Sequence, residues 1–200
     1  MKVLVVGATG TIGQAVVDAL SARHEVVPVS HRQGALRVDI ADQASIARLF
    51  EAAGRVDAVV CTAGAARFRP YASLSDEDFA FSLANKLMGQ VNLVRTGASA
   101  VADGGSFTLS SGILSRSPMP GSTAISLVNA ALEGFARAAA LELPRGIRIN
   151  VVSPGWVTET LRALKMDPST GTPAAVVARA YVRSVEGADT GKVIDALGPA

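Results

Sequence analysis

The chain has 200 residues, of which 49% are hydrophobic and 18% are charged, so it can bury a core and lies outside the composition range of disordered proteins. Its net charge of +2 comes from 19 basic and 17 acidic residues that are scattered along the chain, which argues against a nucleic-acid partner. One cysteine and two histidines exclude an internal disulfide and leave few ligands for a metal, so we expect no metal site and a cytoplasmic, reducing location. The apolar runs are short, and no membrane segment is expected.

The first part of the chain alternates short apolar runs with amphipathic segments, as strands buried on both faces and their covering helices do. Residues 3–6 form an apolar run that ends in a glycine-rich turn, and apolar residues at helical spacing follow over 12–20. Asp42 is the expected N-cap of a helix whose inner face carries Ile46, Leu49 and Phe50. Further strands are predicted at residues 25–29, 35–38 and 57–61.

The same alternation continues to the end of the chain. A Pro-containing loop at 67–75 precedes a long helical region over 76–101, and an alanine-rich helix over 123–143 ends at Pro144. The remaining predicted elements are strands at 106–110, 147–152 and 192–197, and helices at 157–165 and 173–184. Because parallel strands need crossover helices, this order predicts a single α/β domain over residues 1–200, a Rossmann-type doubly wound parallel sheet with helices on both faces.

Three glycines, Gly7, Gly10 and Gly13, lie between the first strand and the first helix. Gly7 permits the tight turn, Gly10 lets backbone N–H groups approach a pyrophosphate, and Gly13 lets the helix pack closely on the strand. In this context the spacing indicates a dinucleotide-binding loop. A structural glycine turn without a ligand is the alternative.

The end of the second predicted strand decides which dinucleotide is expected. An NAD site has an acidic residue there for the ribose hydroxyls, whereas this chain has Ser30, His31 and Arg32. A guanidinium is permanently charged and bidentate, and Ser30 can donate as well, so the segment favours the 2′-phosphate of NADP(H). The alternative is that Arg32 is one solvated loop charge among many.

Together these motifs and several later ones resemble those of the short-chain dehydrogenase/reductase family, from residue 2 to about residue 197. The likeness rests on the glycine loop at 7–13, Asp39-Ile40, Cys61-Thr62-Ala63-Gly64, the segment 149–157 and Thr190-Gly191. The resemblance implies NADP(H) as cofactor and a short C-terminal substrate segment at about 156–190. The cofactor-binding residues it implies are Gly7, Thr9, Gly10, Thr11, Ile12, Gly13, Ser30, His31, Arg32, Asp39, Ile40, Thr62, Ala63, Gly64, Ser110, Pro154, Gly155 and Val157.

The chain departs from the family at the catalytic positions. The family uses a Ser, a Tyr with a Lys four residues later, and an Asn, of which the Tyr exchanges a proton with the substrate oxygen. Alignment with the family places Ile125 at the Tyr position and Asn129 at the Lys position, while Ser111 matches the Ser. The Asn position holds Lys86, as part of Lys86-Leu87-Met88-Gly89.

The pair Lys86 and Asn129 has two interpretations. In one, Lys and Asn have exchanged walls of the pocket, and Lys86, with a depressed pKa, donates the proton while Asn129 positions it or a water. In the other, two independent losses have occurred and Lys86 is solvated, or Lys86 is simply shifted beside Asn85. The candidate catalytic residues are thus Ser111, Lys86 and Asn129.

The sequence therefore predicts an NADP(H)-dependent oxidoreductase that acts on a small, fairly apolar carbonyl or alcohol through an altered catalytic site. A non-catalytic NADP(H)-binding sensor or regulator is the alternative. The helical regions 76–101 and 123–143 are apolar on more than one face, which predicts a homodimer or homotetramer.

Overall fold

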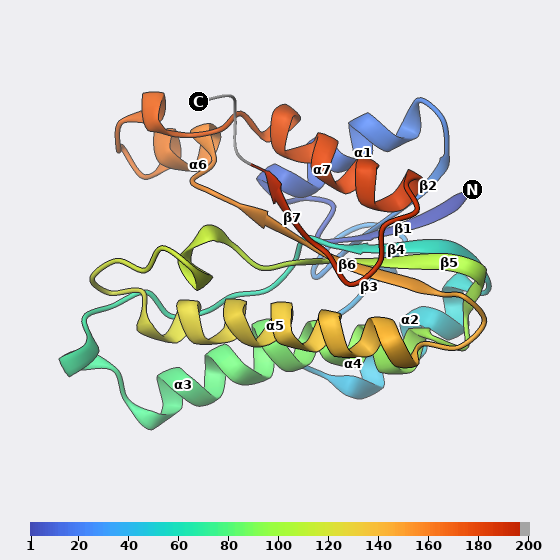
Figure 1. Ribbon diagram of the computed structural model, residues 1–200, viewed down its shortest axis with the longest axis horizontal. Helices are drawn as coiled ribbons and strands as arrows, with labels where there is room; N and C mark the ends of the chain where they lie inside the picture. The colour runs from blue at the N-terminus through green and yellow to red at the C-terminus, as the bar shows by residue number, and fades with distance from the viewer. Residues whose placement is uncertain (197–200) are drawn as a thin grey trace.

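The computed structural model describes residues 1–196, which form one seven-stranded sheet in the order β3-β2-β1-β4-β5-β6-β7 (Figure 1). All neighbouring strands are parallel. The strands are β1 (Lys2–Val6), β2 (Glu25–Ser30), β3 (Leu36–Arg37), β4 (Val56–Cys61), β5 (Val101–Ser110), β6 (Arg148–Pro154) and β7 (Val193–Ala196). The strand order reverses between β1 and β4, which is where doubly wound sheets open a ligand crevice.

Helices cover both faces of the sheet, as the sequence predicts (Figure 1). On one face lie α1 (Thr11–Ser21) and α7 (Ala174–Glu186), and on the other lie α2 (Gln43–Ala53), α4 (Gly89–Gly97) and α5 (Thr123–Glu142). The short helices α3 (Asp76–Ser82) and α6 (Thr158–Ala163) stand beyond the carboxyl ends of the strands. Each layer of helices encloses its own hydrophobic core.

The strand β1 illustrates why these apolar runs form central strands. Val3 and Val5 pack into the core under α1 and α7, whereas Leu4 and Val6 pack into the core under α2, α4 and α5. A strand with neighbours on both faces needs apolar residues at every position, since side chains alternate across the sheet. The predicted Asp42 cap is confirmed, because its carboxylate accepts from the Ala44 N–H at 2.9 Å.

The long helix predicted over 76–101 is wrong in detail. It divides into α3, a π-helical turn η2 (Leu83–Met88) and α4, and Val101 begins β5 instead of ending a helix. Gly104 and Gly105 lie inside β5, where the pairing with β4 shifts register. The helix ends earlier, at Gly97, because the chain must turn there to enter a ten-residue strand.

Within the described residues, the two edge strands differ from the prediction. The third strand contains only Leu36–Arg37, and the last strand is Val193–Ala196, with Leu197 outside the described residues. Edge strands carry hydrogen bonds on one side only, so apolar sequence alone does not fix their length.

Helix α5 has the length and a mean hydropathy, 1.3, that a membrane-crossing helix would have. One face of the helix, 33% of that stretch, packs inside the domain. Val128, Leu132 and Ala136 are buried, and Asn129 and Glu133 are buried with them. Two charged residues, Glu133 and Arg137, lie in the middle of the helix. We interpret α5 as a core helix of the α/β domain.

Candidate functional site

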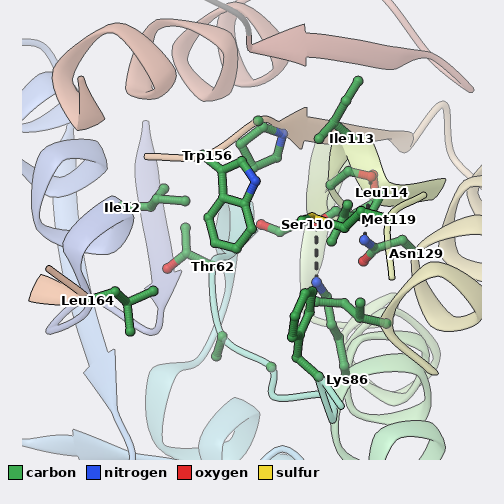
Figure 2. A pocket seen from close by; sticks show the side chains of 18 of the residues that line it. Ile12, Thr62, Lys86, Ser110, Ile113, Leu114, Met119, Asn129, Trp156 and Leu164 are labelled. Atoms are coloured by element: carbon green, nitrogen blue, oxygen red, sulfur yellow. Dashed lines mark hydrogen bonds between the residues drawn. The ribbon is translucent and has the colours of Figure 1, made fainter. Parts of the chain in front are cut away.

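Two adjoining cavities open at the carboxyl ends of the central strands, and they share Thr62, Ala63 and Gly64. The first, of about 600 Å³, is lined by Val6, Gly7, Thr9, Gly10, Ser30, His31, Val38, Asp39, Ile40, Ala41, Thr62, Ala63, Gly64, Ala65, Phe81, Ala84 and Asn85. The second, of about 720 Å³, is lined by Ile12, Thr62, Ala63, Gly64, Phe68, Lys86, Ser110, Ser111, Gly112, Ile113, Leu114, Met119, Ile125, Asn129, Pro154, Gly155, Trp156, Leu164 and Met166 (Figure 2). The two cavities thus adjoin at these three shared residues, beside the switch point of the sheet.

The glycine loop has the geometry expected of a dinucleotide site. Gly7 has φ 89°, and a Cβ on Gly13 would lie 2.0 Å from the Gly7 carbonyl oxygen, so the helix packs directly on the turn. Gly10 is the N-cap of α1 and has no side chain to accept from the first-turn N–H groups. A Cβ there would meet only the Gly7 oxygen, at 3.4 Å, leaving the cavity side open. The first turn of α1 thus fits an anion.

The predicted adenine-side residues are only partly brought together. Ser30, His31, Asp39 and Ile40 line the first cavity, but Arg32 is exposed and is not among its lining residues. The expectation that Ser30 donates to a phosphate is wrong, because its hydroxyl hydrogen goes to the Gln33 carbonyl oxygen while its oxygen accepts from the Gln33 N–H at 3.1 Å. The Ser30 side chain is therefore engaged in the turn after β2.

The other predicted cofactor residues divide between the two cavities. Ile12, Ser110, Pro154 and Gly155 line the second. Thr11 and Gly13 belong to α1 and Val157 is buried as the N-cap of α6, so these three support the walls without lining them. The Thr62 hydroxyl contacts the carbonyl oxygens of Val6 and Gly7 at 3.1 and 3.2 Å and so ties β4 to the glycine loop.

Lys86 projects into the second cavity from the π-helical turn η2 (Figure 2). The residue is buried, with 9% of its surface exposed. Its Nζ donates to the Ser111 carbonyl oxygen at 3.2 Å. Gly64 makes room for the aliphatic stem, because a Cβ there would lie 2.9 Å from Lys86 Cγ. Burial lowers the pKa of Lys86 to about 8, against a smaller opposing effect of Cys61. The solvated alternative for Lys86 is therefore wrong.

Ser111 is 4% exposed and lies directly after β5. Its hydroxyl donates to Glu133 Oε1 at 3.0 Å, and Ser115 donates to the same oxygen at 2.7 Å. Glu133 is itself 5% exposed, on the buried side of α5. A serine hydroxyl has one hydrogen, so Ser111 turns its lone pairs toward the cavity and is an acceptor there.

Asn129 lies one helical turn before Glu133 on α5 and is fully buried. Its amide nitrogen donates to the Gly112 carbonyl oxygen at 3.4 Å, and its Oδ1 has no hydrogen-bond partner among residues 1–196. Lys86 and Asn129 thus bind the adjacent carbonyl groups of Ser111 and Gly112, and no hydrogen bond joins them to each other in the described chain. Any positioning of Lys86 by Asn129 acts through this loop.

Ser110 belongs to a second buried network behind the cavity. Its hydroxyl donates to the Cys61 carbonyl oxygen at 2.5 Å, which leaves the Tyr181 hydroxyl, 2.7 Å away, as the donor in their contact. Burial raises the pKa of Tyr181, so this phenol stays protonated. Burial also raises the pKa of the Cys61 thiol to about 12, which fits the role of a small apolar filler.

Two of these residues, Glu133 and Tyr181, were missed as site components by sequence reasoning. Both stand at helical positions facing the sheet, where the pattern predicts core residues. One feature of the sequence could have indicated Glu133: it is a carboxylate among alanines and leucines, four residues after Asn129. A buried acid needs hydrogen-bond donors, so such a residue points to polar partners nearby. Its partners Ser111 and Ser115 lie about twenty residues earlier, and only the fold brings them together.

Comparisons with known proteins agree with this fold. A family model described as Enoyl-(Acyl carrier protein) reductase matches residues 5–197. The crystal structure of the protein lin1944 from Listeria innocua is 41% identical, covers 98% of both chains and superposes with a TM-score of 0.94. A small-chain dehydrogenase solved in complex with NADPH is 29% identical, covers 98% of this chain and 95% of its own, and has a TM-score of 0.85.

Curated relatives match over a shorter stretch. The oxidoreductases UcpA of Salmonella typhimurium (strain LT2) and of Escherichia coli (strain K12) are 33% identical over 135 residues. The alignments cover 64% of this chain and 51% of each relative, so the chain matches about half the length of these oxidoreductases.

Proposed function

Because this chain belongs to the short-chain dehydrogenase/reductase family, we propose that it is an NADP(H)-dependent oxidoreductase acting on the carbonyl or alcohol of a small apolar molecule. The observation that carries the proposal is the Lys86 ammonium, buried in an apolar cavity beside the strand end that bears Ser111. When bound, NADP(H) supplies or accepts a hydride. What this chain must add is a proton and a charge at the substrate oxygen.

The crevice suits the cofactor on structural grounds. Gly7, Gly10 and the first turn of α1 would hold the pyrophosphate, since the helix dipole and free N–H groups favour an anion. Asp39, Ile40 and His31 line the cavity that would hold the adenine side, and the exposed Arg32 would reach a 2′-phosphate from the turn after β2. NADPH in a 29% identical relative of nearly the same length supports the choice of NADP(H) for this chain.

In the second cavity, Lys86 is positioned to serve as the acid. Ile125 and Asn129, which the family resemblance places at the Tyr and Lys positions, both line this cavity. Lys86 donates to Ser111 O with one of its three hydrogens, so two remain for a ligand. With a pKa of about 8, the ammonium stabilises an oxyanion and can transfer a proton to it near neutral pH.

A specific observation favours a second candidate function, a cofactor-binding sensor without turnover. Tyr181 is one of the chain's two tyrosines, and its hydroxyl bonds to Ser110 behind the cavity. No residue that lines the cavity is a tyrosine, so none of them can give a phenol proton to the reacting oxygen. Such a protein would keep the glycine loop and lose the acid.

The test titrates the purified protein with NADPH and with NADH, followed by a carbonyl screen. The oxidoreductase proposal expects tighter binding of NADPH and oxidation of NADPH with at least one small carbonyl compound. NADPH binding without turnover across the screen would favour the sensor, and no binding of either nucleotide would contradict both.

A further inference from the structure

The hydroxyl groups of the second cavity all direct their hydrogens into the protein. Thr62 gives its hydrogen to the carbonyl groups of the glycine loop, Ser110 to Cys61 O, and Ser111 to Glu133. Each hydroxyl therefore offers the cavity lone pairs only. A substrate oxygen that needs a hydroxyl donor finds none in this lining.

Lys86 is the charged donor that remains, beside the neutral indole N–H of Trp156 and the amide group of Asn129. Its ammonium has three hydrogens, of which the Ser111 carbonyl oxygen takes one. No carboxylate within residues 1–196 forms an ion pair with it. A buried cation without a counter-charge is costly, and a ligand that brings an anion removes that cost.

The remainder of the lining is apolar and wide. Trp156 faces the cavity opposite Lys86, with Leu164, Ile113 and Met119 around it (Figure 2). Phe68 packs edge-to-face on Trp156 at 6.4 Å between ring centroids. Lys86 is the one charged residue among the lining residues. The cavity thus suits a ring-sized apolar body with a single anionic end.

We propose that the substrate is an apolar 2-oxo acid or the corresponding 2-hydroxy acid, whose carboxylate and adjacent reacting oxygen share the two remaining hydrogens of Lys86. Two oxygens on neighbouring carbons are close enough for one ammonium to bind both. The Oδ1 of Asn129, buried without a partner in the described chain, is an acceptor on the same wall. This inference rests on the proposed function and adds the chemical class of the substrate.

The proposal fixes the sign of a pH effect. The Lys86 pKa, lowered to about 8 by burial, means that the free site is cationic at pH 7 and becomes neutral as the pH rises through 8. Affinity for an acid should therefore fall at alkaline pH, while affinity for the uncharged amide of the same acid should not. Below pH 7 the acid's affinity should change little until its own carboxylate takes up a proton.

The experiment compares 3-phenyllactate with 3-phenyllactamide on the full chain, with NADPH and without it. Trp156 is the chain's one tryptophan and lines the cavity, so its fluorescence reports binding at this place, and calorimetry gives the affinities. At pH 7 the acid should bind about tenfold more tightly than the amide or better. Lys86→Met should abolish that preference, and Lys165→Met, which removes an exposed lysine near the same cavity, should keep it.

Equal affinities for acid and amide at pH 7, or a preference that survives Lys86→Met, would overturn the proposal. If Lys86→Met does not fold, the pH series on the unmodified protein decides: a preference that is lost by pH 9.5 supports the proposal, and a constant one overturns it. Failure of the proposed function is distinguishable. In that case NADPH does not bind, or no compound of the carbonyl screen oxidises it, whatever the acid does. Turnover of neutral carbonyl compounds without an acid preference refutes this inference alone.

Discussion

Ser111 and Glu133 form a buried hydrogen bond of 3.0 Å between a strand end and a core helix, and Ser115 donates to the same carboxylate oxygen. This contact reverses the role expected of Ser111. The sequence resemblance makes it a donor to the substrate oxygen, whereas its hydrogen points away from the cavity. In the proposed function, Lys86 instead of Ser111 therefore donates the hydrogen bond to the substrate oxygen.

The Glu133 contact has a consequence for stability. Glu133→Ala leaves the buried Ser111 hydroxyl and the half-buried Ser115 hydroxyl without their acceptor, so the free energy of unfolding should fall by ~1–3 kcal/mol. Glu133→Gln keeps an acceptor oxygen and should lose less than half of that. Urea unfolding of both variants measures the difference, and an alanine variant as stable as the unmodified protein would show that the carboxylate does not hold this loop.

Cofactor choice is tested at Arg32. Arg32→Ala should weaken NADPH binding by ~1.5–3 kcal/mol and leave NADH nearly unchanged, because only NADP(H) has a 2′-phosphate for the guanidinium. Arg95→Ala, an exposed arginine on α4, is the matched control. Equal losses of both nucleotides on Arg32→Ala would remove the residue from phosphate recognition.

Cys61 should be inert in the folded protein. Its thiol is fully buried and burial raises its pKa to about 12, so thiolate is scarce at pH 8. Iodoacetamide should alkylate the native chain slower than the unfolded chain by about a hundredfold or more. Mass spectrometry of timed samples gives both rates, and comparable rates would mean that the strand end opens readily.

Self-association remains a prediction, and the structure changes which helix supports it. Leu93 and Val94 of α4 are buried by the chain's own core, whereas Leu127 and Leu141 of α5 are 45% and 88% exposed. An exposed leucine pair on a long apolar helix favours a dimer or tetramer built on α5. Sedimentation should give a multiple of 20.4 kDa at micromolar concentration, and Leu141→Asp should reduce it. A monomer of the unmodified protein would contradict this.

The sequence predicts the sheet class, the glycine loop and most elements correctly because buried parallel strands leave continuous apolar runs such as 3–6. It predicts the region around Lys86 less well. A π-helical turn and an α-helix share the same apolar pattern, so the step from α3 through η2 to α4 is visible only in the structure. The burial of Lys86 depends on that turn and on Gly64.

Hydrogen-bond direction is the second feature that sequence could not supply. Ser30, Ser110 and Ser111 are all identified as candidate site residues from motifs, yet each gives its hydrogen to a protein oxygen. Which way a hydroxyl points depends on carbonyl and carboxylate groups far away along the chain. The motif therefore predicts the place of a serine and not its role.

The central claim is that Lys86 acts on the substrate oxygen, and steady-state kinetics of Lys86→Met tests it most directly, with NADPH affinity measured on the same sample. The account predicts that kcat/KM for a carbonyl substrate falls by ~10²- to 10⁴-fold, since a general acid contributes that much, while NADPH affinity stays within a few-fold. Lys165→Met should leave both unchanged. Unchanged kinetics in Lys86→Met would contradict the account and remove this residue from the mechanism.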